Sequence, residues 1–67
     1  MKQFNPPKYV KGLNIKFGEN PFVLLAQFAF SATRQMWSKE EIEVVIRMAK
    51  NGNYMNLIKI LRLHIKK

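Results

Sequence analysis

Cysteine is absent from this chain of 67 residues, which also has only one histidine and four acidic residues, all of them glutamate. Without cysteine no disulfide can stabilise the fold, and with His64 as the only imidazole a structural metal site lacks its usual ligands. A chain of this size has one core, which supplies roughly 3 to 5 kcal/mol of stability. Oligomerisation is the stabilising device that remains. We therefore expect a homo-oligomer with no metal and no other cofactor.

A long hydrophobic run is also missing. The longest apolar stretch covers residues 21–30 and is interrupted by Gln27, whereas a membrane-spanning helix needs about 20 apolar residues. Residues 1–4 contain one lysine and nothing that resembles the apolar region of a signal peptide. These absences predict a protein without a transmembrane segment, located in the cytoplasm.

The chain is rich in apolar and basic residues. A hydrophobic content of 48%, with 12% aromatic residues, is too high for a disordered chain, so we expect it to fold. The net charge is +8, and every glutamate lies between residues 19 and 43, which leaves both ends of the chain purely basic. Such a field attracts phosphate backbones, nucleotides, acidic proteins or anionic lipid. A basic surface that only keeps the protein soluble is the alternative.

The carboxylates have structural explanations. Glu40 and Glu41 fall at a helix start, where they complement the helix dipole, and Glu43 precedes Arg47 by one helical turn. Glu19 lies beside another predicted helix start and has no base or nucleophile motif near it. The sequence therefore predicts a protein that is not an enzyme and has no catalytic residues.

The N-terminal part is predicted to be extended. Pro6 and Pro7 disfavour a helix, so residues 1–12 should form an arm. Apolar and polar residues alternate over residues 13–17, which is typical of a short strand with one buried face. No other segment alternates in this way. We expect the strand to pair with the arm, with another copy of the chain, or with nothing.

Three helices are predicted, over residues 20–36, 38–51 and 53–66. Each begins at a side chain that caps helices, namely Asn20, Ser38 and Asn53. The first helix has only a narrow polar stripe and should be buried around most of its circumference. The third is more apolar than one small core requires, which suggests a second contact surface. The predicted fold class is mostly α: one domain of residues 1–67, with the arm and strand before a compact three-helix bundle.

Two helix starts are candidates for binding an anion. The segments Gly18-Glu19-Asn20 and Asn51-Gly52-Asn53 place a glycine and an asparagine beside the first N–H groups of a helix, a position that binds phosphate or carboxylate groups. Ordinary capping explains both segments equally well. With the basic residues that we expect nearby, the predicted ligand-binding set is Lys16, Gly18, Asn20, Arg34, Asn53 and Arg62.

Nucleic-acid binding is the alternative function. A tight turn joins the second and third predicted helices, as in a helix-turn-helix, and the third helix would present Asn56, Lys59, Arg62 and Lys66 to a groove. A basic helix in a plain three-helix bundle has the same pattern. A third hypothesis is an inhibitor that docks on an acidic host protein.

The segment from residue 18 to residue 57 resembles a group of small uncharacterised phage and prophage proteins. Their pattern is a short strand, a Gly-x-Asn-Ala-Phe helix start, a second helix, and a Ser-Gly-Asp-Tyr-x-x-Leu turn. In this chain the two motifs read Gly18-Glu19-Asn20-Pro21-Phe22 and Asn51-Gly52-Asn53-Tyr54-Met55-Asn56-Leu57. The resemblance implies a phage origin and a compact helical fold, and no particular chemistry.

These expectations combine into one leading hypothesis. Small phage proteins without catalytic groups commonly act by occupying another molecule. We expect a homo-oligomer in the host cytoplasm that sequesters a phosphorylated, nucleotide-type ligand, such as a host defence signal. Nucleic acid and an acidic host protein remain the alternative partners.

Overall fold

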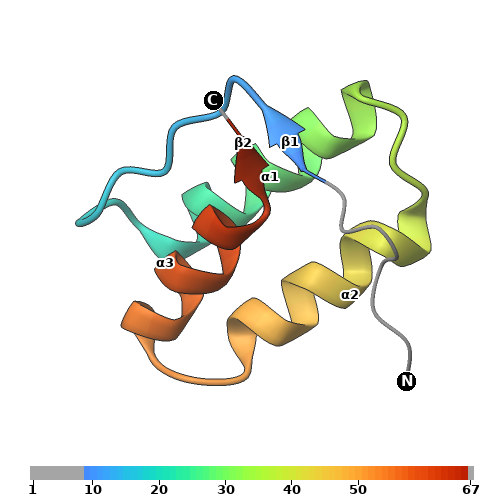
Figure 1. Ribbon diagram of the computed structural model, residues 1–67. Helices are drawn as coiled ribbons and strands as arrows, with labels where there is room; N and C mark the ends of the chain where they lie inside the picture. The colour runs from blue at the N-terminus through green and yellow to red at the C-terminus, as the bar shows by residue number, and fades with distance from the viewer. Residues whose placement is uncertain (1–8, 67) are drawn as a thin grey trace.

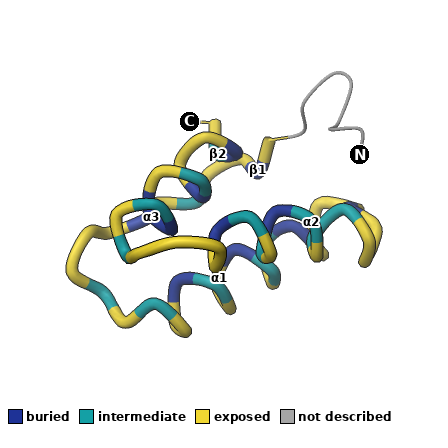
Figure 2. Tube along the Cα trace, turned by 90° about the horizontal axis from the view of Figure 1, so that it is seen from below, coloured by how far each residue is buried: buried dark blue, intermediate teal, exposed yellow. Residues whose placement is uncertain are grey.

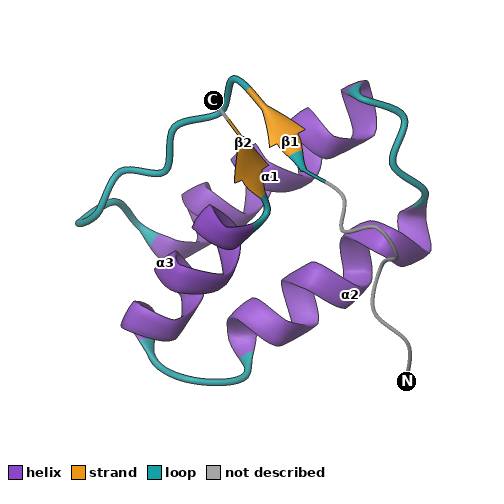
Figure 3. Ribbon diagram, in the orientation of Figure 1, coloured by secondary structure: helices purple, strands orange, loops and turns teal. Residues whose placement is uncertain are grey.

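The computed structural model describes residues 9–66 and is mostly helical (Figure 1). Along the chain it contains β1 (Val10–Lys11), α1 (Pro21–Arg34), α2 (Lys39–Lys50), α3 (Tyr54–Leu63) and β2 (Ile65–Lys66). The three helices pack around one core, and the two short strands pair beside them (Figure 3). The predicted fold class, a compact three-helix bundle after a short N-terminal strand, is confirmed.

The strand is not where the alternating pattern placed it. The prediction of a strand over residues 13–17 is wrong, because residues 13–16 have no regular structure and Phe17 begins a turn. The strand lies instead at Val10–Lys11, within the predicted arm, and ends at Gly12, whose φ of +79° is in the left-handed region. Residues 1–8 of the arm lie outside the described residues.

The partner of β1 is the C-terminal end of the same chain. β1 and β2 run parallel, with Val10 opposite Ile65 and Lys11 opposite Lys66. The Val10 N–H donates to the His64 carbonyl at 2.7 Å, which pulls the chain out of helical geometry after Leu63. The prediction of helix as far as residue 66 is therefore wrong. His64, the residue that follows the helix, is buried.

The helix starts follow the capping chemistry of the sequence. The Asn20 side-chain oxygen accepts from the N–H groups of Phe22 (2.8 Å) and Val23 (3.4 Å). Ser38 and Glu41 form the expected capping box, with reciprocal bonds of 2.7 and 3.1 Å. The helix ends are less well predicted. α1 stops two residues before residue 36, because Met36 has a φ of 72° and the next N–H turns back to a carbonyl of α1.

The core is formed by one face of each helix. Its buried apolar side chains are Val10, Ile15, Leu24, Phe28, Ala32, Trp37, Val45, Ala49, Leu57, Ile58 and Leu61. Phe28 of α1 lies edge-on to Trp37 with ring centroids 5.5 Å apart. These contacts join the C-terminal half of α1 to the start of α2.

One face of α1 is not covered. Buried and exposed stretches alternate along this helix (Figure 2). Phe22 is 75% exposed and Phe30 is 65% exposed, on the side opposite to Leu24 and Phe28. The expectation that the first helix is buried around most of its circumference is therefore wrong for a single copy of the chain.

Candidate anion-binding site

A hydroxyl group joins the two helix starts that the sequence singled out separately. Tyr54, the first residue of α3, donates its hydroxyl proton to the Glu19 carbonyl at 2.6 Å. The same oxygen accepts from the Gly18 N–H at 2.8 Å. Gly18 has a φ of 101°, which favours glycine, and this turn leads directly into the cap of α1 at Asn20. The start of α1 and the start of α3 thus lie against each other.

The loop that precedes α1 runs beside α3 (Figure 1). The Arg62 guanidinium, two turns further along α3 than Tyr54, donates to the Ile15 carbonyl at 3.0 Å. Lys16 follows Ile15 and is exposed. We call the region formed by the loop of residues 15–20 and the adjoining residues of α3 the loop–α3 junction.

The junction brings together most of the predicted ligand-binding residues. Gly18 and Asn20 flank the carbonyl that Tyr54 binds, and Asn53 directly precedes Tyr54. Arg34 lies elsewhere, since the 14 residues of α1 place it roughly 20 Å along the helix axis from Asn20. Its guanidinium lies over the Phe30 ring, 5.7 Å from the centroid. Within one copy of the chain, Arg34 does not reach the junction.

The two asparagines use their oxygens as caps. The Asn53 side-chain oxygen accepts from the Asn56 N–H at 2.9 Å, as the Asn20 oxygen does in α1. Both residues are exposed, and among residues 9–66 no partner is found for the amide NH₂ group of either one. Capping therefore accounts for the oxygens, and the NH₂ groups remain as outward donors.

Sequence reasoning missed two aromatic rings at this junction. The predicted strand over residues 13–17 placed Phe17 on its buried face, but Phe17 is 58% exposed. Its ring lies edge-on to Tyr54 at a centroid distance of 5.4 Å, and Tyr54 itself packs against the core. The sequence feature that could have predicted the exposure of Phe17 is the glycine that follows it. A turn at Gly18 means that the strand has already ended at Phe17. An exposed ring next to a lysine offers one surface for a base and one charge for a phosphate.

The residues of the nucleic-acid alternative have separate roles. Lys59 and Arg62 lie on the outer face of α3, where they line an open hollow of about 750 Å³ together with Met55 and Leu63. Asn56 is half-buried, and its amide donates to the carbonyls of Met48 (3.1 Å) and Ala49 (3.4 Å) at the end of α2.

The Lys66 ammonium lies over the Tyr9 ring, 5.4 Å from the ring centroid. Asn56 thus has a structural role, and Lys59 and Arg62 are the cations that the outer face of α3 itself presents.

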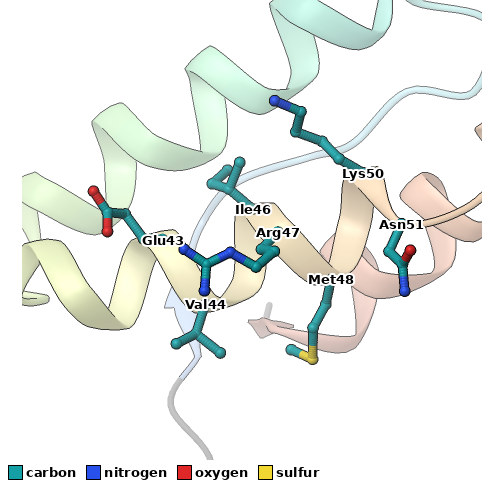
Figure 4. Close-up of a pocket in the computed structure, with 7 residues that line it drawn as sticks. All are labelled: Glu43, Val44, Ile46, Arg47, Met48, Lys50 and Asn51. Carbon is teal, nitrogen blue, oxygen red and sulfur yellow. The ribbon is translucent and has the colours of Figure 1, made fainter.

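A larger hollow of about 830 Å³ lies along α2 and has a different character. It is lined by Glu43, Val44, Ile46, Arg47, Met48, Lys50 and Asn51, which all lie within α2 or directly after it (Figure 4). Glu43 and Lys50 lie at opposite ends of this surface and do not converge on one point. Its two cations, Arg47 and Lys50, extend in different directions, so they do not converge on one anion (Figure 4).

The described residues contain neither a metal site nor a membrane-spanning helix. Across residues 9–66 no three His, Asp or Glu side chains are close enough to hold a metal ion. None of the helices in that range is long and apolar enough to cross a membrane. No protein-family model, curated protein or solved structure matches the chain.

Proposed function

We propose that this is a non-catalytic binding protein that holds a phosphorylated, nucleotide-type ligand at the loop–α3 junction. The observation that carries the proposal is the exposed ring of Phe17 beside Lys16, in a loop that Tyr54 fixes against α3. A nucleotide needs a flat apolar surface for its base and cationic or N–H donors for its phosphates. The junction supplies both within one short loop.

The phosphate donors come from two elements. Lys16 lies in the loop, and Arg62 lies on α3, where its bond to the Ile15 carbonyl holds the guanidinium near the loop while its other N–H groups stay available. The NH₂ groups of Asn20 and Asn53 add neutral donors at the two helix starts, where the helix dipoles favour negative charge. We expect these groups to be the donors that contact the phosphates.

Sequestration is the mode of action that we propose. The sequence contains no catalytic motif, so we propose that an effect on a nucleotide signal would come from holding the nucleotide. The phage setting, the host cytoplasm and a role against a host defence signal belong to this proposal through the resemblance of residues 18–57 to small phage proteins.

A titration with fluorescent nucleotides tests the proposal. N-methylanthraniloyl derivatives of mono- and dinucleotides are added to the protein at physiological salt, and anisotropy is recorded. We expect saturable binding that is weakened at least about tenfold by Lys16→Glu and by Phe17→Ala, since each removes a principal contact. The matched control is Arg47→Glu, which makes the same change in charge on the outer face of α2. Equal affinity in Lys16→Glu and Arg47→Glu would contradict the proposed site.

Nucleic-acid binding is the second candidate, and the outer face of α3 favours it. Lys59 and Arg62 are exposed there, and the sequence from residue 44 onward has no acidic residue that would repel a phosphate backbone. This function predicts binding to a generic DNA duplex that falls steeply between about 50 and 200 mM salt. Lys59→Glu should weaken duplex binding and leave nucleotide binding unchanged.

A further inference from the structure

The outer face of α1 is an exposed apolar stripe. Phe22, Ala26 and Phe30 follow one another at intervals of four residues, with Val23 beside them, so all four lie on the same side of the helix. All four are exposed in the part of the chain that the structure describes, residues 9–66. The core-facing residues of α1, among them Phe28, lie on the opposite side. We call Phe22, Val23, Ala26 and Phe30 the α1 outer face.

We propose that the α1 outer face binds the same face of a second copy of the chain, with the two helices antiparallel about a two-fold axis. Because the net charge is +8, two copies repel each other where basic surfaces meet. Residues 20–33 have no charged side chain, so this face lets two copies approach without placing like charges together. It also offers no cation to an anionic lipid surface or a nucleic acid.

The ends of α1 determine the direction of pairing. Glu19 precedes the helix, and Arg34 is its last residue. In an antiparallel pair the Glu19 of one copy lies near the Arg34 of the other, which brings opposite charges together twice. A parallel pair would place the two Arg34 side chains next to each other. The antiparallel arrangement is therefore the one that the charges favour.

The exposed area is sufficient for a modest dimer. An aromatic side chain has about 150 to 250 Å² of surface, so Phe22 and Phe30, at 75% and 65% exposure, leave roughly 280 Å² per copy open to water. The neighbouring side chains Val23, Ala26, Gln27, Thr33 and Arg34 extend the contact. Over both partners the phenylalanines supply roughly 560 Å², about half of the ~1,200 Å² of the smallest standard interfaces, and the neighbouring side chains have to supply the rest. We expect a dimer that forms at micromolar concentrations.

The pairing has a consequence for the ligand site, which rests on the proposed function. The antiparallel helix brings Arg34 of the second copy near Glu19 and Asn20, beside the loop–α3 junction. Within its own copy Arg34 lies roughly 20 Å from the start of α1. In the dimer it would reach a phosphate bound at the loop–α3 junction of the other copy. Arg34 would bind ligand only in the dimer.

Sedimentation velocity over about 1 to 200 µM protein tests the interface without any ligand. We expect the wild type to change from monomer to dimer in this range. Phe22→Ser with Phe30→Ser should raise the dissociation constant about thirtyfold or more, since aromatic residues at an interface centre are typical hot spots. The control is Met55→Ser with Leu63→Ser, two residues of α3 that are 61% and 63% exposed. A monomeric wild type at 200 µM, or a greater loss of dimer in the control, would overturn the proposal.

A charge reversal tests the antiparallel arrangement. Glu19→Arg and Arg34→Glu should each weaken the dimer, and the variant with both changes should regain it because the pairs are re-formed with reversed sign. No recovery in the double variant would overturn this arrangement. Circular dichroism of each variant checks that the helices remain. A dimer that binds no nucleotide would contradict the proposed function alone, because the interface is measured without ligand.

Discussion

Replacing Tyr54 by phenylalanine should show how far one hydroxyl group supports the loop–α3 junction. The oxygen takes part in two hydrogen bonds, to the Glu19 carbonyl at 2.6 Å and from the Gly18 N–H at 2.8 Å. Tyr54→Phe removes both and leaves the ring that packs against Phe17.

The magnitude follows from the surroundings of the two bonds. A protein hydrogen bond contributes about 0.5 to 1.5 kcal/mol. The bond to Glu19 is partly buried and the bond from Gly18 is exposed, so water can replace the second more easily than the first. We expect the free energy of unfolding to fall by about 1 to 2 kcal/mol, which is a large share of the stability of a domain this small.

Urea denaturation followed by circular dichroism measures this change. Wild type and variant are compared at the same protein concentration, because dimer formation makes the apparent stability depend on concentration. The control is Tyr9→Phe, since Tyr9 is 41% exposed and no hydrogen bond is found for its hydroxyl among residues 9–66.

Amide exchange at Gly18 should also become faster in Tyr54→Phe. A variant within about 0.3 kcal/mol of the wild type would refute the role that we assign to the hydroxyl.

Three further substitutions test other contacts of the fold. Gln35→Leu should lower the free energy of unfolding, measured in urea, by about 1 to 2 kcal/mol. The Gln35 amide both accepts from and donates to the Lys11 backbone at 2.9 Å, and so covers the outer edge of β1. A urea midpoint equal to that of the wild type would contradict this role. Gly18→Ala should cost about 1 kcal/mol, since φ there is 101° and open space around the position leaves backbone conformation as the only penalty. Thermal unfolding measures this cost. An unchanged melting temperature would contradict it and would mean that the turn adopts another conformation. Asn56→Ala should destabilise by about 1 kcal/mol by removing the amide that donates to the carbonyls of Met48 and Ala49 at the end of α2, and exchange rates in the last turn of α2 should rise. Unchanged rates there would mean that water takes over the role of the amide.

The helix starts were predictable because their chemistry is local. Asn20, Ser38 and Asn53 each bind N–H groups two or three residues further on, so the pattern that fixes the cap is contained in four or five consecutive residues. The overall three-helix architecture followed from these starts and from the apolar periodicity between them.

The strand pair was not predictable in the same way. Val10 and Ile65 are paired from opposite ends of the chain, and each strand has only two residues, too few for an alternating pattern. The alternation over residues 13–17 instead reflects a loop that buries Ile15 against the core. His64 stands beside this pair: its carbonyl accepts from the Val10 N–H, and its buried ring lies with Nδ1 2.9 Å from the Ile60 carbonyl.

The candidate site was predictable in part. The sequence pointed to Gly18, Asn20 and Asn53 from turn and cap chemistry, but the contact that joins them is made by Tyr54 across more than 30 residues. No pattern of neighbouring residues records such a contact. The narrow polar stripe of α1 was visible in the sequence and was interpreted as burial within one copy. Its outer face is instead exposed, and we propose that a second copy covers it.

Mapping a nucleotide on the protein by NMR tests the central claim most directly. A chain of 67 residues gives a well-resolved spectrum of backbone and side-chain amides, and a cyclic dinucleotide is titrated into the ¹⁵N-labelled protein. We expect shifts concentrated in the N–H groups of residues 16–20 and in the side-chain NH₂ groups of Asn20 and Asn53. Shifts confined to the outer face of α3, or no shifts at millimolar nucleotide, would contradict a ligand site at the loop–α3 junction.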